Sequence, residues 1–239
     1  MQGWQKVRTV LVFEMKREWI GLIATSLFAV YFGAVFIFIV EQDANGELPF
    51  MSAMRDWIYL FAFPLFGCMM HRTVFHYWRQ DPFTKRVAHW RTMPVPISAI
   101  AGARYAQSLL THFAAGGLFL TLQYIVSSDL RAIASASEWI AAGLVWFAYG
   151  VLIQAFYVYL ELGFPGKTFV LYYTAYTVLA GVVSALVAVL GGSLFRELLA
   201  VVKENPALSV SAALIVAAAA LAAGYRLTTS RMRTRRYSF

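Results

Sequence analysis

The sequence has 239 residues, of which 60% are hydrophobic and only 13% are charged, and its formal net charge is +8. An average soluble domain is about 25% charged, so this chain has too little polar surface for a soluble globule. The composition predicts an all-α integral membrane protein, and the length (residues 1–239) suits one domain of six membrane-spanning helices. The single cysteine, Cys68, excludes an intramolecular disulfide and a cysteine-rich metal site.

The first 19 residues predict an amphipathic helix. Trp4, Val7, Leu11 and Met15 recur at steps of three and four residues, with basic side chains around them. Such a helix lies flat on a membrane surface, so we expect residues 1–19 to form an interfacial helix before the first span. A frayed polar segment is the alternative.

Apolar runs predict the spans. Five of them approach the ~20 residues that a crossing helix needs, and they cover residues 20–40, 105–126, 139–160, 169–190 and 208–225. The second span is weaker, because the apolar run from Trp57 to Met70 is too short to cross at about 1.5 Å per residue. We expect this helix to continue through His71 and Arg72 and to occupy residues 57–78.

The basic residues predict the orientation. With six spans, sixteen of the 20 Lys and Arg residues lie on the side that holds both termini, including a basic tail over 226–239. Basic residues concentrate on the cytoplasmic side of membrane proteins. We therefore expect a multi-pass protein of a bacterial cytoplasmic membrane with both termini in the cytoplasm, and the positive charge needs no nucleic-acid partner.

The long connection between spans 2 and 3 predicts a short cytoplasmic helix. Asp81-Pro82 is a typical helix start, and Phe83, Val87 and Trp90 then share one face. A short helix with an aromatic knob and basic flanks suits docking into a groove on another protein. An interfacial helix held by lipid headgroups is equally consistent with the pattern.

The connection between spans 5 and 6 is too hydrophobic for an ordinary loop. Leu194, Leu198, Leu199 and Val202 form an apolar stripe, and Pro206 follows. We expect a short re-entrant or interfacial helix here, because backbone at membrane depth is tolerated only when it is helical or covered.

The sequence shows no pattern typical of an enzyme or a metal site. The histidines lack metal-ligand spacing, and Gly166-Lys167-Thr168 matches only the end of a phosphate-binding loop, with Glu161 where that motif needs glycine. We interpret Gln123 and Gln154 as hydrogen-bond partners between helices. Polar groups at membrane depth are functional candidates, and those that could line a pathway are His71, Arg72, Tyr172 and Tyr176.

Three features together resemble one family. They are the basic helix before the first span, the hydrophobic fifth connection, and the stretch Trp90-Arg91-Thr92-Met93-Pro94-Val95-Pro96-Ile97-Ser98 with Arg104 beyond it. The layout resembles the membrane subunits, or permeases, of type-2 ABC exporters, which commonly carry a Leu-Pro-Ile/Val-Ser-like stretch and a basic residue there. This chain departs from that stretch by Met93 and by the additional Pro96.

The resemblance implies that the short cytoplasmic helix is a coupling helix that docks on a separate ABC ATPase subunit. Two permeases, identical or related, would pair with two such ATPases, which would bind ATP and Mg, while this chain would bind no cofactor. ATP binding would bias a two-state helix arrangement and move substrate outward. The implied docking residues are Phe83, Lys85, Arg86, Val87, Trp90, Arg91, Met93 and Pro94.

Two other functions fit the same spans. One is a membrane scaffold without transport, such as an immunity or regulatory protein that works without an ATPase. The other is a membrane enzyme that acts on lipid, which a lipid-processing activity lost on mutation of His71 or His112 would favour.

Overall fold

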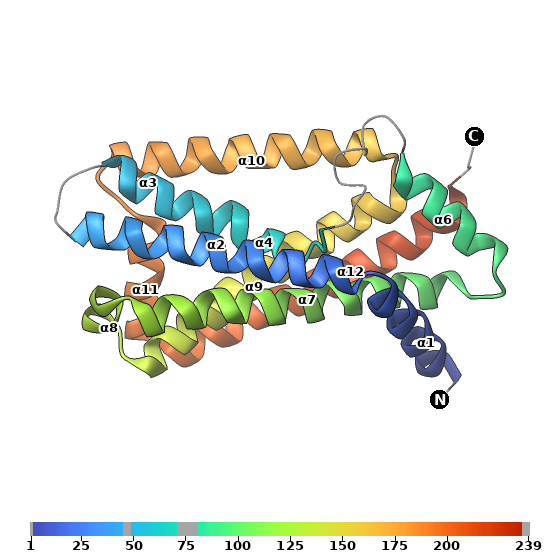
Figure 1. Ribbon diagram of the computed structural model, residues 1–239, viewed down its shortest axis with the longest axis horizontal. Helices are drawn as coiled ribbons and strands as arrows, with labels where there is room; N and C mark the ends of the chain where they lie inside the picture. Colours follow the sequence, from blue (N-terminus) through green and yellow to red (C-terminus); the bar gives the residue numbers. More distant parts are fainter. Residues whose placement is uncertain (1, 45–48, 71–80, 236–239) are drawn as a thin grey trace.

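A computed structural model of the protein describes residues 2–44, 49–70 and 81–235, and every regular element within these ranges is a helix (Figure 1). Five helices are long and apolar enough to cross a membrane. They are α2 (Trp19–Ala44), α7 (Ile97–Val126), α9 (Ala136–Gly163), α10 (Gly166–Val189) and α12 (Pro206–Thr234). The all-α membrane fold is therefore confirmed, and each of these helices contains or closely matches a predicted span.

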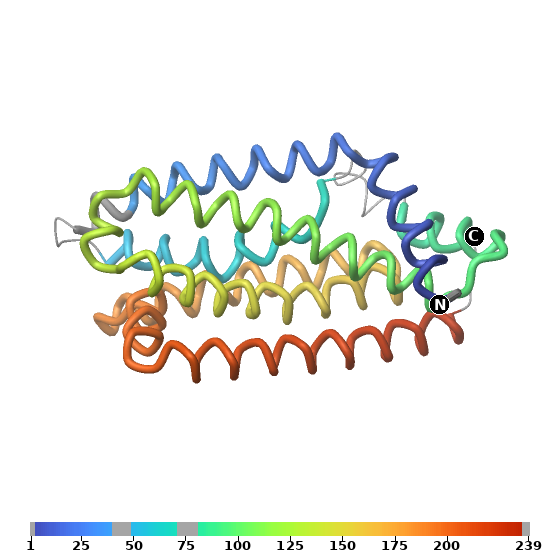
Figure 2. Tube along the Cα trace, turned by 90° about the horizontal axis from the view of Figure 1, so that it is seen from below, coloured from blue at the N-terminus to red at the C-terminus, as the bar shows by residue number. Residues whose placement is uncertain are grey.

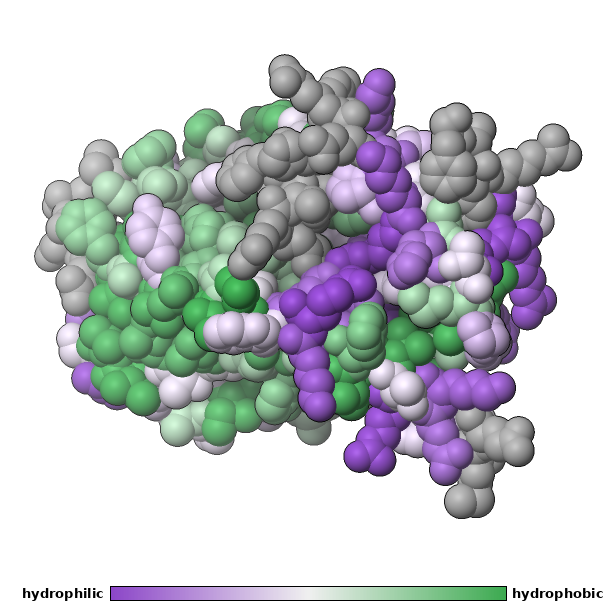
Figure 3. Space-filling model, turned by 45° about the vertical axis from the view of Figure 1, so that its right-hand side comes forward, coloured by the Kyte–Doolittle hydropathy of each residue, from purple (hydrophilic) through white to green (hydrophobic). Residues whose placement is uncertain are grey.

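The short helices lie at the two ends of the bundle. Helices α1 (Gln2–Arg17) and α6 (Pro82–Thr92) lie at one end, and α8 (Ser128–Ile133) and α11 (Leu194–Glu204) lie at the other (Figure 1). The start of α1 and the end of α12 lie together at the α6 end (Figure 2). Hydrophilic residues gather at this end, whereas the rest of the visible surface is largely apolar (Figure 3).

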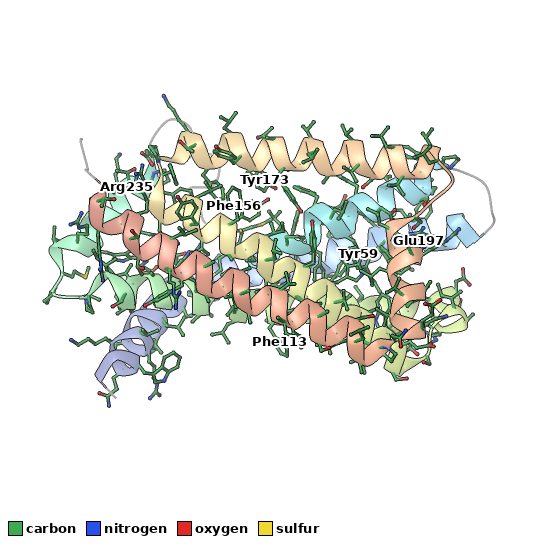
Figure 4. All side chains as sticks on the ribbon, turned by 180° about the vertical axis from the view of Figure 1, so that it is seen from behind. Tyr59, Phe113, Phe156, Tyr173, Glu197 and Arg235 are labelled. Atoms are coloured by element: carbon green, nitrogen blue, oxygen red, sulfur yellow. The ribbon has the colours of Figure 1, made fainter. Side chains whose placement is uncertain are left out.

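The core lies where α9 meets the other long helices. Trp139 and Trp146 of α9 pack with Phe36 of α2 and with aromatic residues of the neighbouring helices. At the centre, Tyr59 is fully buried (Figure 4), and its hydroxyl donates to Gln123 Oε1 of α7 at 2.6 Å. Gln123 is thus a hydrogen-bond partner between helices, as predicted.

The second predicted span differs from the prediction. Helix α3 (Pro49–Trp57), a π-helical turn (Ile58–Ala62) and α4 (Phe63–Leu65) follow one another without a gap, and the helix ends there. The helix therefore begins eight residues before the predicted 57 and does not run through residues 66–70. His71, Arg72 and the rest of the predicted segment up to residue 78 lie outside the described residues.

Pro64 explains the early end. In an α-helix the amide of residue 64 would donate to the carbonyl of Leu60, but proline has no N–H. The Leu60 carbonyl instead accepts hydrogen bonds from the hydroxyls of Tyr149, at 3.1 Å, and Tyr176. The Pro64 carbonyl accepts from the side-chain amide of Gln154, the second predicted interhelical partner. Neighbouring helices thus satisfy the freed backbone groups, which membrane depth requires.

Helix α1 is present as predicted, but its apolar residues divide between two surroundings. Val7 packs against α7, where a Cβ added to Gly102 would lie 3.2 Å from Val7 Cγ2. Trp4 is 66% exposed. Glu14, which lies on the same helix face as Val7 and Leu11, is buried.

Helix α11 confirms the predicted short helix in the fifth connection, and it runs across the end of the bundle (Figure 1). Leu199 and Val202 of the predicted stripe are buried together with Phe195, whereas Leu194 and Leu198 are half-buried. The stripe therefore covers the ends of the long helices.

Candidate functional site

Helix α6 begins at an aspartate that serves two helices. Asp81 has φ 41°, and its Oδ1 accepts from the Thr84 amide at 3.2 Å and from the Gly166 amide, the first of α10, at 2.8 Å. The Thr84 hydroxyl also donates to Asp81 Oδ2 at 2.6 Å. A carboxylate at a helix N-terminus satisfies free amides and complements the helix dipole. Asp81 therefore fixes α6 to the start of α10.

The apolar face of α6 packs against its own chain. Phe83, Val87 and Trp90 are all at most 4% exposed. The Phe83 ring meets that of Phe169 of α10 edge-on at 5.1 Å, and the other two residues join a core with α7, α9 and α12. The prediction that these three side chains dock on another protein needs correction. Periodicity identified the shared face, but the surface that covers it belongs to this chain.

The other face of α6 is basic and polar. Lys85, His89 and Arg91 are exposed, as is Pro94, while Met93 is half-buried. Three of the eight predicted docking residues are therefore exposed, and Arg86 and Met93 are half-buried; the exposed His89, one turn from Lys85, was not among them. The surface that α6 offers to a partner is cationic, not aromatic.

Arg86 points inward and joins a chain of ion pairs. Its Nη2 pairs with Glu18, between α1 and α2, and its Nη1 lies 3.7 Å from Glu161 Oε1 of α9. Arg104 of α7 donates from Nε to Glu161 Oε2 at 2.8 Å, and its Nη2 lies at the same distance. We call Glu18, Arg86, Glu161 and Arg104 the α6-end network. It joins α6 to three other parts of the fold, so Arg86 is a packing residue of this chain.

Polar contacts extend the network along α7. Arg104 Nη1 donates to Gln107 Oε1 at 2.7 Å, and Gln107 Nε2 lies 2.7 Å from the sulfur of Met69. The turn after α4 is thereby connected to the same set of charges.

Other contacts extend the network along α1. Arg17 Nη2 lies 2.7 Å from Glu14 Oε2 and 2.9 Å from Glu18 Oε1. Burial raises the pKa of Glu14 above its usual range, and the nearby charges of Arg86 and Arg17 only partly oppose this shift. Burial of Glu14 therefore disfavours its charged form.

The network is buried enough for its pairing to matter. The side chains of Arg104 and Glu161 are 5% and 6% exposed. Removal of one partner from a buried ion pair typically costs about 3–5 kcal/mol, because an uncompensated charge remains. If α6 moves, Glu18, Glu161 and Arg104 must therefore either move with it or form ion pairs with other partners.

The C-terminal end of α12 is hydrogen-bonded to α9 and α6 at the same end of the bundle. Arg235 Nη1 donates to the Leu162 carbonyl at 3.0 Å, and its Nη2 donates to the Thr84 hydroxyl. Arg91 Nη1 donates to the Arg235 carbonyl at 3.4 Å. Arg235 lies at the α6 end of the bundle, far from Glu197 on α11 (Figure 4).

Of the four predicted pathway residues, the structure describes Tyr172 and Tyr176. His71 and Arg72 are not among the described residues. Tyr172 is 49% exposed and meets Phe156 edge-on at 5.9 Å, whereas Tyr176 is half-buried and donates to Leu60. The hydroxyl of Tyr176 is therefore used to complete the interrupted helix.

His112 is enclosed. Its side chain is fully buried, its ring stacks on Phe147 at 4.7 Å, and Phe63 meets it edge-on at 5.0 Å. A Cβ added to Gly150 would lie 2.2 Å from His112 Nε2. This enclosure leaves no room for a lipid substrate beside the ring.

A second buried charge cluster lies at the opposite end and was not predicted. Asp56, fully buried on α3, accepts from the amides of Leu194 at 2.6 Å and Phe195 at 3.0 Å, and from Ser193 Oγ at 3.1 Å. Arg55 Nη2 donates to Ser193 Oγ at 2.8 Å, and Arg55 Nε lies 3.9 Å from Asp56 Oδ1. We call this the α11-end cap. The clue in the sequence was an adjacent pair of opposite charges beside an apolar run.

In the ranges that the structure covers, no three His, Cys, Asp or Glu side chains gather as a metal ion would require. Comparison with known proteins gives no family assignment. No protein-family model matches the chain, and no curated protein matches its sequence.

Proposed function

We propose that this protein is the membrane-spanning permease subunit of an ABC exporter. In this proposal the chain crosses a bacterial cytoplasmic membrane six times, with both termini and α6 in the cytoplasm. Helices α3 and α4, joined by the π-helical turn, belong to the second crossing. The common position of the start of α1 and the end of α12 supports an even number of crossings (Figure 2), and the distribution of basic residues supports the orientation.

The observation that carries the proposal is the attachment of α6. This helix lies outside the bundle at its hydrophilic end, with a cationic face outward and Arg86 paired inward. A partner that moves α6 would act through Glu18 and Glu161 on α1, α2 and α9, and through Arg104 on α7. This is the arrangement expected of a coupling helix that receives a displacement from an ATPase.

The ATPase subunits, in this proposal, bind ATP and Mg, and this chain supplies the pathway. Nucleotide binding can bias the helix arrangement only if the ATPase binds one arrangement of α6 better than the other. A second permease, identical or related, would complete the pathway. The apolar outward face of α10, at the edge of the bundle, supports such pairing (Figure 1).

The test is whether ATP hydrolysis activity stays with the tagged protein when it is purified from its native membrane. The double variant Lys85→Glu, His89→Glu reverses the cationic face of α6 without touching its buried face. We expect it to reduce the co-purifying activity at least tenfold. The partner surface that matches a cationic α6 is acidic, and the new glutamates would place like charges at the interface, which is strongly unfavourable. Arg226→Glu, an exposed charge reversal on α12, is the matched control and should retain the activity.

Equal activity in all three proteins would refute the role assigned to α6. Purified protein that carries no ATPase activity at all would refute the permease assignment and would favour a scaffold without transport.

A further inference from the structure

A cavity of about 310 Å³ lies between the turn after α4 and the helices α6, α9 and α10. Leu65, Met70 and Val170 form much of its apolar wall, and the ion-paired Glu161 and Arg104, the latter from α7, line its polar side. Tyr173 also lines it, from the side of α10 that faces α9 (Figure 4). Because α10 begins at the α6 end, the cavity lies near the polar end of the bundle.

On the α9 side, Glu161 lines the cavity and has a polar atom whose hydrogen-bonding capacity is unused, whereas Tyr157 is not among the lining residues. Glu161 Oε1 is buried and has no hydrogen-bond partner among the residues that are described, since Arg86 Nη1 is 3.7 Å away. One turn earlier, the buried Tyr157 hydroxyl also lacks a partner in the described part of the chain. The Tyr157 ring lies 5.9 Å from the rings of Phe169 and Tyr173, which both line the cavity.

An unpartnered acceptor in the cavity wall determines which hydrogen-bonding groups the head of a ligand must have. A buried acceptor without a donor is destabilising, and a bound donor would remove that cost. The Glu161 charge is already matched by Arg104, so a positive charge on the ligand is not required. An anionic or purely hydrogen-bond-accepting head would leave Glu161 Oε1 unsatisfied and would be repelled by it.

We propose that this cavity binds a single-chain amphiphile from the membrane whose head donates hydrogen bonds, as a hydroxyl or a protonated amine does. The head lies at Glu161 Oε1, and the chain lies against Leu65, Met70 and Val170. The site requires only that the protein is embedded in a membrane. Binding there therefore does not depend on the proposed ATPase subunit, although Glu161 and Arg104 also belong to the α6-end network.

Cys68 lines the cavity and is the only cysteine in the chain, so its chemical modification reports whether the cavity is occupied. The protein is placed in phosphatidylcholine nanodiscs, whose headgroup has no hydrogen-bond donor. Modification by methyl methanethiosulfonate is followed as the change in intact mass. We expect dodecylamine and monolauroylglycerol to slow the reaction at least fivefold. Dodecyltrimethylammonium has the same charge and chain as dodecylamine but no N–H, and it should leave the rate unchanged.

Two valine substitutions on α10 locate the effect. Val170→Trp fills the cavity without changing a charge, and we expect dodecylamine to give no further protection in this variant. Val178→Trp is the matched control, because Val178 is 60% exposed on the outer surface of α10, and it should behave as the wild type.

Equal protection by the primary amine and the trimethylammonium compound would overturn the proposal, since it would show chain partition without recognition of the head. Undiminished protection in Val170→Trp would place the ligand elsewhere and overturn it too. If the Cys68 thiol is not modified even when no amphiphile is present, the cavity is closed, and the proposal is overturned as well. Each of these results is independent of whether an ATPase co-purifies.

Discussion

The two ends of the bundle bury charge in different ways. At one end, the α6-end network pairs side chains that come from four separate parts of the fold, and Arg104 and Glu161 meet in a charge-assisted contact at 2.8 Å. At the other end, Asp56 bonds mainly to the backbone amides and Ser193 at the start of α11, and Arg55 Nε stays 3.9 Å from it.

This difference separates a connection between helices from the closure of one helix end. A carboxylate that accepts backbone amides fixes one helix terminus and has no alternative partner of equal quality. Two arginines that share carboxylates can exchange partners when the helices shift. We infer that the α6 end is built for displacement and that the α11 end is built to stay in place.

The largest effect is expected from Glu161→Ala. It leaves the guanidinium of Arg104 buried without its carboxylate, so the free energy of unfolding should fall by about 3–5 kcal/mol. Thermal unfolding of the purified protein in detergent measures this loss. The double variant Arg104→Met, Glu161→Leu removes both charges and should recover most of the stability. If the double variant is as unstable as the single one, the network contributes through packing and not through charge.

A smaller and more local effect is expected from Asp56→Ala. The amides of Leu194 and Phe195 lose their acceptor, so α11 should be destabilised by about 0.5–2 kcal/mol, as for the loss of a helix cap. Hydrogen exchange followed by mass spectrometry should show faster amide exchange in α11 and an unchanged exchange rate at the α6 end. Asp56→Asn keeps an acceptor and should lie between the two. Faster exchange in α6 after Asp56→Ala would contradict the separation of the two ends.

The middle of the molecule provides a third comparison. Tyr149→Phe combined with Tyr176→Phe removes both hydroxyl donors from the Leu60 carbonyl, at about 0.5–1.5 kcal/mol for each hydrogen bond. Exchange should rise over the π-helical turn and α4, without a change at either end. Each single variant should have less than half of the combined effect, because one hydroxyl can still serve the carbonyl. An effect that reaches α6 or α11 would show that the interrupted helix couples the two ends.

The sequence predicted most of the helices because their signals are local. An apolar run of sufficient length marks a span, Asp81-Pro82 marks the start of α6, and the stripe through Leu199 and Val202 marks α11. Pro64 was also a local signal for the end of the second helix, since an internal proline removes a backbone donor. The apolar residues on both sides of Pro64 obscured it.

The candidate site could be predicted only in part, because its contacts join distant residues. Periodicity shows that Phe83 and Trp90 share a face, but not that Phe169 and the core beside α9 cover that face. Arg104 and Glu161 are 57 positions apart, so no spacing rule pairs them. Two opposite charges at the same end of neighbouring spans could have indicated the pair, since a buried charge needs a partner.

The smallest effect is expected from Glu14, and it has a definite sign. Because burial raises the pKa of Glu14 above its usual value near 4.5, folding favours the protonated carboxyl. The protonated Glu14 carboxyl contributes its full stabilisation when the pH is below the pKa of Glu14 in the unfolded chain. This stabilisation is lost as the pH rises through the pKa of Glu14 in the folded protein. Wild type and Glu14→Gln should therefore be equally stable below that usual value, and wild type should become relatively less stable toward neutral pH. Thermal unfolding of both proteins across this range measures the difference. The opposite trend would show that Arg17 and Arg86 outweigh burial, so that Glu14 belongs among the paired charges of the α6 end.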